Sequence, residues 1–343
     1  MICFFFRKPH EHKNSIENVF NLVVASIPTK LVKIFYLKEE YAGIKSIMKN
    51  LKYVRSKSGQ INHITGDVHY LALALPRKKT ILTIHDIGSA LHGNSFKKFL
   101  IKLLWFWLPA LKVRKITVIS ENSANEVRKL IPFARKKIAV IPNPLNPEIV
   151  HAPKPFNKEK PVILLLGTKT NKNLERTIEA LSTIQCYLVI VGKLSQQQLL
   201  LLNKLNLTDQ LNNQNTEPMT CRQTDILTNY YNLPFSQIIK LYQQCDLVCF
   251  ASTYEGFGMP IIEAQATGRP VVTSEISSMP EVAGDAACFV DPYSVESIRE
   301  GIHKVINDDT YRESLIQKGM ENVKRFEAKK IAAQYMAIYK EMM

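Results

Sequence analysis

The stretch that most constrains the fold is a glycine-bearing turn between an apolar run and a helix-like run. Residues Leu247–Phe250 are apolar throughout, which is typical of a buried strand. Gly256 and Gly258 follow, and they allow the main chain to turn sharply and to approach a ligand closely. Pro260 suits the first turn of a helix, where its missing N–H costs nothing. This order of elements presents main-chain N–H groups and the positive end of a helix dipole, which suits an anion such as phosphate.

Two glutamates flank the turn. Glu255 directly precedes Gly256, and Glu263 lies within the expected helix. Carboxylates repel phosphate, but they accept hydrogen bonds from hydroxyl groups, each worth about 1.5–3 kcal/mol. Phosphates in the middle and hydroxyls at both ends describe a nucleotide-sugar. The alternative is a surface loop with solvated glutamates, which is the usual interpretation of such a pair when it stands alone.

Three runs together carry a family resemblance: YEGFGMPIIEA at 254–264, GRPVV at 268–272 and MPEVAGDAA at 279–287. This region resembles the signature region of retaining glycosyltransferase family 4. The resemblance is strong from Val162 onward and weaker before it. It implies an α/β protein of the GT-B fold, in which two Rossmann-like, doubly wound parallel-sheet domains face a central cleft.

The pattern of the whole chain agrees with that fold class. Strand-like and helix-like segments alternate in both halves, which predicts two parallel sheets. Prolines cluster at 142–147 and a polar stretch follows at 151–160, so we place the domain boundary there. The resemblance then implies an acceptor-side domain at 1–150, a nucleotide-sugar domain at 151–325, and a helix at 326–343 that crosses back to the first domain.

The second half restarts with a buried strand that ends in Gly167 and Thr168. Two lysines follow, Lys169 and Lys172. The resemblance implies that Lys172 binds the donor diphosphate. Many relatives have arginine where this chain has Thr168, which leaves Lys172, with Lys169 nearby, as the main cation. The expected donor-binding residues are Gly167, Thr168, Lys169, Lys172, Gly256, Phe257, Gly258 and Glu263.

A further polar pair ends an apolar run in the first half. His85 and Asp86 follow residues 80–84, and open α/β sheets place their chemistry at the carboxyl ends of strands. A lone histidine is more often structural. The resemblance implies instead that His85 contacts the donor sugar, with Asp86 on the acceptor or sugar side. Glu255 and His85 are therefore the expected catalytic residues.

The charge and the cysteines bound the partners. The formal net charge is +15, which favours a polyanionic partner, although no recognised nucleic-acid motif accompanies it. No nucleic acid is expected as a partner. The six cysteines show no metal-ligand spacing and are interpreted as reduced core residues. No Asp-x-Asp motif is needed to hold the diphosphate, so no metal and no cofactor are expected.

The segment from Phe96 to Leu108 has two interpretations. On a helix its lysines fall on one side, while its phenylalanine, leucine and tryptophan side chains fill the other. Such a helix suits peripheral contact with an anionic membrane, together with the basic residues that follow it. It also suits a helix packed on the domain core with its lysines in water. Both interpretations stay open at this point.

The expected function combines the residue chemistry and the resemblance. It is metal-independent, retaining transfer of a hexose from a GDP- or UDP-sugar to a hydroxyl of a glycan or lipid-linked acceptor in cell-surface polysaccharide or lipopolysaccharide synthesis, with a mannosyltransferase-like activity favoured. The start of the chain has basic residues after its apolar run, the reverse of a signal peptide, so a cytoplasmic location is expected. Association with the inner face of the cell membrane stays open with the two interpretations of segment 96–108. The alternatives are a nucleotide-sugar epimerase, a phosphorylase, or a non-catalytic protein that binds polyanions or membrane.

Overall fold

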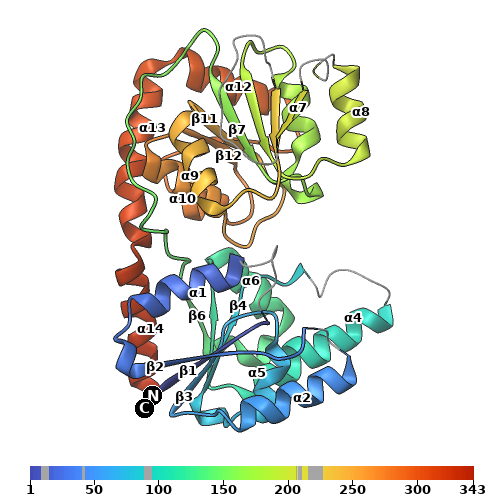
Figure 1. The fold of residues 1–343 in the computed structure, drawn as a ribbon, viewed down its shortest axis with the longest axis vertical. Helices are drawn as coiled ribbons and strands as arrows, with labels where there is room; N and C mark the ends of the chain where they lie inside the picture. The colour runs from blue at the N-terminus through green and yellow to red at the C-terminus, as the bar shows by residue number, and fades with distance from the viewer. Residues whose placement is uncertain (9–14, 41–42, 89–94, 206, 208–210, 215–226) are drawn as a thin grey trace. The chain divides into compact units, whose positions relative to one another are not determined.

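The computed structural model describes residues 1–8, 15–40, 43–88, 95–205, 207, 211–214 and 227–343. These residues form two compact units (Figure 1). Unit 1 contains Met1–Asn146 and Phe326–Met343, and unit 2 contains Pro147–Arg325. The sequence placed the first boundary after residue 150 and the second after residue 325, whereas the units divide after residues 146 and 325.

Unit 1 is built on a six-stranded sheet in the order β2-β1-β3-β4-β5-β6, and every neighbouring pair is parallel. Its central strands β1, β3 and β4 are buried along their whole length, as a parallel sheet covered by helices requires. The strands are β1 (Ile2–Phe6), β2 (Val32–Tyr36), β3 (Ile61–Ile64), β4 (Thr80–Ile84), β5 (Lys115–Val118) and β6 (Ile138–Val140).

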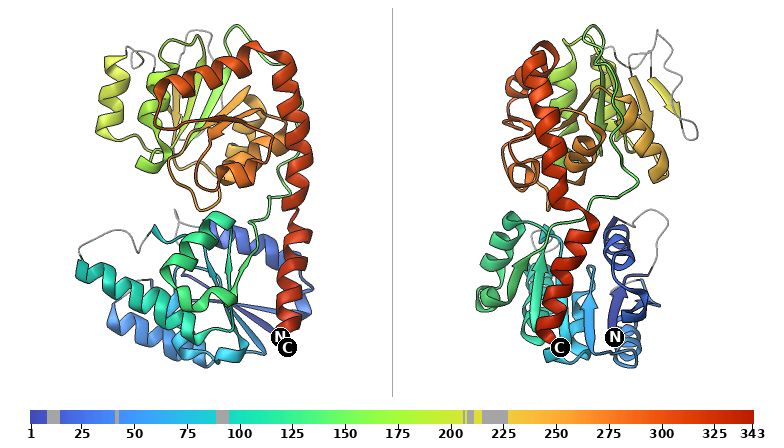
Figure 2. Two further views of the ribbon diagram at one scale, coloured as in Figure 1. Left: turned by 180° about the vertical axis from the view of Figure 1, so that it is seen from behind. Right: turned by 90° about the vertical axis from the view of Figure 1, so that its left-hand side faces the viewer.

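The alternation of side chains along β1 divides unit 1 into two cores. Phe4 and Phe6 join a cluster with residues of α1 (Ser15–Ala25) and α14 (Ala328–Met342). Phe5 joins a second cluster with residues of α2 (Ile44–Arg55) and α5 (Leu108–Lys112). Because successive residues of a strand point to opposite faces, the two helix groups cover opposite faces of the sheet, as Figure 2 also shows.

Unit 2 is built on a seven-stranded parallel sheet in the order β13-β12-β11-β7-β8-β10-β9. The strands are β7 (Val162–Leu166), β8 (Tyr187–Val191), β9 (Leu211–Gln214), β10 (Leu227–Tyr230), β11 (Leu247–Phe250), β12 (Val271–Ser274) and β13 (Cys288–Val290). The helices are α7 (Leu174–Leu181), α8 (Gln196–Lys204), α9 (Phe235–Gln244), α10 (Met259–Thr267), α11 (Met279–Ala283), α12 (Val295–Asn307) and α13 (Asp309–Asn322).

The strand order of each sheet reverses at one point. In unit 2 the chain runs outward from β7 through β8 and then returns to the other side at β11. In unit 1 it runs from β1 to the edge strand β2 and returns at β3. Loops diverge at the carboxyl ends of the strands that meet at such a reversal, and open α/β sheets bind their ligands there. In unit 2 the fold therefore predicts a ligand site at the carboxyl ends of β7 and β11.

The segment 96–108 is not one regular α-helix. It comprises α4 (Ser95–Ile101), a π-helical segment η4 (Lys102–Trp107) and the start of α5. Trp105 donates its indole N–H to the carbonyl oxygen of Asp67, and Trp107 donates to that of Leu130. Phe106 is buried. Trp105, Phe106 and Trp107 therefore pack within unit 1, while Phe99 and Leu100 are exposed.

The cysteines that the structure describes are Cys3, Cys186, Cys245, Cys249 and Cys288, and all five are free thiols in buried positions. Burial raises the pKa of the Cys186, Cys245 and Cys249 thiols to about 12. Cys221 lies outside the described residues.

Candidate active site

The loop between β11 and α10 has the conformation that its glycines and proline predict. Gly258 lies at the N-terminal cap of α10 with φ of 107°, in the left-handed region that favours glycine. Pro260 occupies the first turn, and Gly268 ends the helix with φ of 76°. The main chain therefore reaches the start of α10 from the carboxyl end of β11.

Two serines hold this loop in place. The hydroxyls of Ser277 and Ser278 both donate to the carbonyl oxygen of Glu255, at 2.8 and 3.0 Å. Ser278 also donates to the carbonyl oxygen of Phe257 at 2.7 Å. These bonds fix the main chain on both sides of Gly256. They join residues far apart in sequence, so no local pattern predicted them.

Lys172 and Glu255 form an ion pair across the ends of β7 and β11. The Lys172 Nζ lies 2.7 Å from the Glu255 Oε1, and the two side chains are only 20% and 14% exposed. The Lys172 Nζ also lies 4.6 Å from the centroid of the Phe250 ring. Asn171 donates from its side-chain amide to the carbonyl oxygen of Tyr254 at 2.9 Å. The structure thus brings the expected cation and the expected catalytic carboxylate together.

Gly167 makes room for Lys172. A Cβ atom at position 167 would lie 2.8 Å from the Cγ of Lys172, and the φ of Gly167 is +95°. A side chain here would both strain the main chain and displace the lysine. This glycine therefore allows the lysine side chain to cross the end of β7.

Glu263 lies on α10 and is almost fully buried, at 8% exposed. The hydroxyl of Tyr242 donates to its Oε2 at 2.6 Å. Burial raises the pKa of the Glu263 carboxyl, while the hydrogen bond from Tyr242 and the charge of Lys172 both act to lower that pKa. Lys172 thus acts electrostatically on Glu263 as well as pairing with Glu255.

Thr168 and Lys169 lie on the same turn as Lys172. The Thr168 hydroxyl donates to the carbonyl oxygen of Lys193 at 2.6 Å, and its side chain would clash with any Cβ at Gly192. Lys169 is exposed and its carbonyl oxygen accepts from the N–H of Lys172. In this structure the hydroxyl of Thr168 therefore ties the turn to the end of β8.

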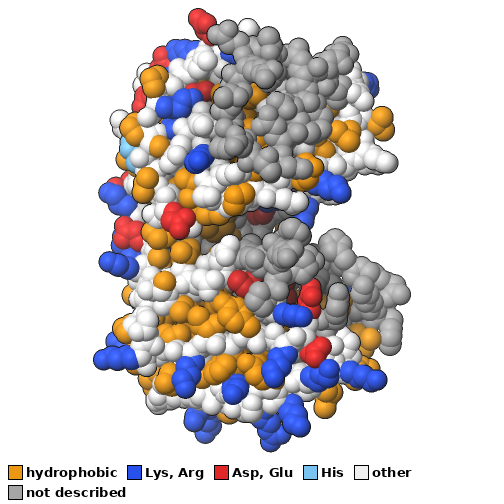
Figure 3. All heavy atoms as spheres, in the orientation of Figure 1, with side chains coloured by type: hydrophobic (Ala, Val, Ile, Leu, Met, Phe, Trp, Pro, Cys, Tyr) orange, Lys and Arg blue, Asp and Glu red, His pale blue; other side chains and the backbone are white. Residues whose placement is uncertain are grey.

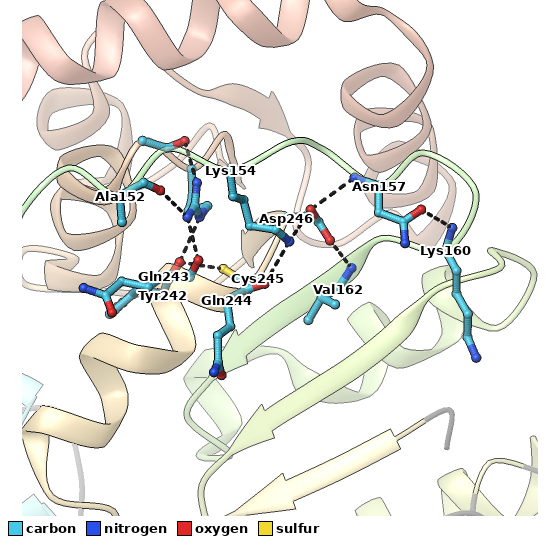
Figure 4. A network of polar contacts seen from close by, with 12 residues as sticks. Ala152, Lys154, Asn157, Lys160, Val162, Tyr242, Gln243, Gln244, Cys245 and Asp246 are labelled. Atoms are coloured by element: carbon cyan, nitrogen blue, oxygen red, sulfur yellow. Dashed lines mark hydrogen bonds and ion pairs between the residues drawn. The ribbon is translucent and has the colours of Figure 1, made fainter. Parts of the chain in front are cut away.

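A network of hydrogen bonds and one ion pair holds the C-terminal end of α9, close to Tyr242 (Figure 4). The guanidinium of Arg269 donates to the carbonyl oxygens of Tyr242, Gln243 and Ala152. Asp246 is fully buried and accepts from Lys154 at 2.6 Å and from the N–H of Val162 at 2.8 Å. Since α9 carries Tyr242, this network supports the tyrosine that contacts Glu263. Sequence reasoning missed Tyr242 because no local signal links it to Glu263.

His85 and Asp86 belong to unit 1. His85 is buried, and its Nε2 lies 2.9 Å from the carbonyl oxygen of Thr65. Burial lowers the pKa of His85, which favours its neutral form. Asp86 accepts from the main-chain N–H of Gly88 at 2.8 Å. Both residues lie at the carboxyl end of β4, where the sequence placed them.

Two features of the described residues bear on metals and membranes. These residues contain no group of three or more His, Cys, Asp and Glu side chains that is placed to hold a metal ion. Among the helices in that part of the chain, none combines the length and the apolar character that a membrane span needs.

Known proteins resemble both halves of the chain. The family described as glycosyl transferases group 1 matches residues 147–322, and glycosyltransferase family 4 matches residues 10–149. O-antigen chain mannosyltransferase B of Escherichia coli is 37% identical over 108 residues, which cover 32% of this chain and 28% of that protein. The serotype-specific mannosyltransferase WbdA of Escherichia coli is 27% identical over 260 residues, 68% of this chain and 30% of that protein. The chain thus spans less than a third of the length of these relatives.

A solved structure shares the fold over nearly the whole chain. Anabaena HepE in complex with UDP and glucose superimposes with a TM-score of 0.77 at 14% identity, covering 99% of this chain and 100% of that one. The predicted GT-B fold class, with two Rossmann-like parallel-sheet domains, is confirmed. Because the group 1 pattern covers more than half of the sequence, the chain belongs to the glycosyl transferases group 1, within glycosyltransferase family 4.

Proposed function

We propose that the chain transfers a hexose, with mannose favoured, from a nucleotide-sugar to a hydroxyl group of a glycan or lipid-linked acceptor, with retention at the anomeric carbon. The proposal rests mainly on one observation. Lys172, Glu255 and Glu263 converge where the ends of β7 and β11 meet at the strand-order reversal of unit 2. The mannosyltransferase names of the two bacterial relatives support the choice of sugar.

The donor diphosphate would bind between Lys172 and the start of α10. The helix dipole and the main chain around Gly256 and Gly258 favour negative charge there. The cation of Lys172 is paired with the carboxylate of Glu255 at 2.7 Å. Donor binding therefore exchanges a carboxylate partner for a diphosphate. Charge that develops on the leaving diphosphate is then stabilised by groups already in place, and this term usually dominates such catalysis.

The two carboxylates have separate roles in this proposal. Glu263, held by Tyr242, accepts hydrogen bonds from the ribose hydroxyls. Glu255, released from Lys172, faces the transferred sugar. His85 of unit 1 contributes a neutral imidazole to the sugar. Lys172 and the helix start supply the positive charge, so the proposal includes no metal.

Thermal unfolding with UDP-, GDP- and ADP-sugars tests donor binding. A ligand that binds only the folded state raises its stability according to affinity and concentration. We expect one base class to raise the unfolding temperature and Lys172→Met to reduce that rise. If no nucleotide-sugar raises it, the proposed donor site is wrong. Epimerised sugar formed without an acceptor would identify an epimerase instead, and dependence on inorganic phosphate would identify a phosphorylase.

A further inference from the structure

The charge of the chain is concentrated in one unit. Unit 1 contains 28 Lys and Arg against 10 Asp and Glu, a formal charge of +18, so unit 2 carries the remaining −3 of the total of +15. The candidate donor site lies in unit 2, so donor binding does not account for the excess in unit 1. A large charge of one sign indicates attraction to a surface of the opposite sign.

Part of this charge surrounds an apolar groove in unit 1. The groove has a volume of about 630 Å³ and lies between α2 and the 3₁₀ segment η2 (His69–Ala74). Its lining combines the apolar side chains of Met48, Leu51, Leu73, Ala74, Leu75 and Pro76 with two basic ones, Lys52 and Arg55, and with Ser58.

The exposed side of α2 carries apolar side chains next to basic ones. Ile44 and Met48 are one helical turn apart and are 83% and 61% exposed, although both are apolar. Lys45 and Lys52 are exposed on the neighbouring ridge. A helix whose outer face contacts only water would have polar side chains at positions 44 and 48. Apolar tips bordered by cations are instead typical of a helix that lies in a membrane interface.

The opposite wall of the groove continues this pattern. Pro76 leads directly into η3 (Arg77–Lys79), whose three basic residues are all exposed. The segments 44–55 and 69–79 together contain seven Lys and Arg and no Asp or Glu. A nearby carboxylate, Glu39, is paired with Lys49 at 3.0 Å. Figure 3 shows Lys and Arg side chains gathered along this edge of unit 1 beside apolar ones.

We propose that this groove face, made by α2, η2 and η3, docks on a bilayer that contains anionic phospholipid. Ile44 and Met48 would enter the interface, while Lys52, Arg55 and the residues of η3 contact lipid phosphates. The charge decides between occupants, because a second copy of this chain would bring another strongly basic face against it. The segment 96–108, whose Trp105 and Trp107 are hydrogen-bonded within unit 1, is not the principal contact. The proposal does not depend on the glycosyltransferase activity.

Flotation of the full chain with vesicles, without substrates, tests this surface. We expect binding to vesicles of phosphatidylcholine with phosphatidylglycerol, and little binding to phosphatidylcholine alone. Each basic residue near an anionic surface contributes about fivefold to partitioning. Lys52→Glu with Arg55→Glu should therefore weaken binding more than tenfold. Ile44→Ser with Met48→Ser should remove the part of the binding that persists at high salt.

The matched control reverses two charges on the other face of the same sheet. Lys329 and Lys330 are exposed on α14, which covers the core opposite to α2. Lys329→Glu with Lys330→Glu changes the net charge equally and should leave most of the binding intact. The proposal is wrong if the control weakens binding as much as the α2 variants, or if the wild-type chain does not float. Self-association that is lost in the Ile44→Ser, Met48→Ser variant would identify a dimer interface instead. Circular dichroism and unfolding temperature verify that each variant is folded.

Discussion

The two units share an architecture but differ in the charged groups at their strand-order reversals. In unit 2 the reversal joins Lys172 to Glu255, a pair with a buried second carboxylate close by. In unit 1 the cation at the reversal is Arg7, which is bound to Glu17 at 2.8 Å and to Asp67 at 3.1 Å. Lys172 therefore pairs with one carboxylate, whereas Arg7 is held between two.

The buried ionisable groups differ in the same way. Unit 1 buries His63, His69 and His85, and burial lowers the pKa of each, so all three favour the neutral form. Unit 2 buries Glu263 beside a cation and a tyrosine hydroxyl, which oppose the effect of burial on its pKa. Unit 1 thus buries neutral histidines and the carboxylate Glu17, which is paired with Arg7, whereas unit 2 buries a carboxylate whose ionisation a cation and a hydroxyl favour. The following predictions test this division.

The largest effect is expected from Glu255→Ala. Transfer and donor hydrolysis should fall by about 10²–10³, the usual cost of removing one group that stabilises a transition state. The fold should remain intact because Ser277 and Ser278 bind the main chain at position 255, not its side chain. Glu296→Ala, an exposed glutamate of the same unit, is the control. Turnover close to the wild-type value would remove Glu255 from the mechanism.

Lys172→Met should weaken donor binding about 10- to 100-fold, because a charge-assisted hydrogen bond contributes about 1.5–3 kcal/mol. The variant also leaves Glu255 without its cation in a largely buried position. The combination with Glu255→Gln should therefore cost less than the two separate losses in binding. Calorimetric titration with the donor measures the affinity of each single variant and of the double variant. Lys204→Met, at an exposed position that ends α8, should bind as the wild type does.

These two positions also show what the sequence was able to predict. Repeated apolar runs predicted parallel sheets in both halves, although the polar strands β9 and β10 carry no such signal, and the glycines and proline predicted the start of α10. The ion pair of Lys172 with Glu255 joins residues 83 positions apart, so only the strand order brings it about. The hydrogen bond of Tyr242 to Glu263 and the interrupted helix at 96–108 depend on packing in the same way, which local patterns do not encode.

Mild acid should destabilise unit 1 before unit 2. Burial lowers the pKa of His63 to about 3, and its ring is bound on both sides by the hydroxyls of Tyr339 and Thr83. The stability from a neutral histidine is complete above about pH 6.5 and is lost as the pH falls toward 3. Each such histidine removes about 1.4 kcal/mol of unfolding free energy per pH unit in this window.

Hydrogen exchange followed at several pH values measures this difference between the units. Amides of β3 and β4 should lose protection between about pH 6 and pH 5, while amides of β7 and β11 change less. His63→Gln, compared with wild type, should show a shallower loss with falling pH even if it is less stable at neutral pH. Equal acid sensitivity of the two sheets would contradict the division.

The smallest effect is expected from Tyr242→Phe, which leaves both carboxylates in place. Burial raises the pKa of Glu263, and the hydrogen bond from Tyr242 opposes that rise. Removing the hydroxyl makes ionisation of Glu263 less favourable, so its pKa rises further. The stability that Glu263 contributes as a protonated group is lost as the pH rises through its folded pKa, and the variant moves that loss to higher pH.

Donor affinity should follow the ionised form of Glu263, because an ionised carboxylate is the better acceptor for ribose hydroxyls. The higher pKa of Glu263 in the variant therefore lowers donor affinity. We expect affinity to fall about fivefold at neutral pH, which is about 1 kcal/mol, because Tyr242 acts on the donor only through Glu263. The fall should be larger at lower pH, and a donor without ribose hydroxyls should show little difference between variant and wild type. Tyr293→Phe, at a 60% exposed position, controls for the substitution itself. A pH profile of donor affinity identical to that of the wild type would show that Tyr242 only packs against Glu263. In that case the Tyr242 hydroxyl would not stabilise the ionised form of Glu263, and this difference between unit 2 and unit 1 would not hold.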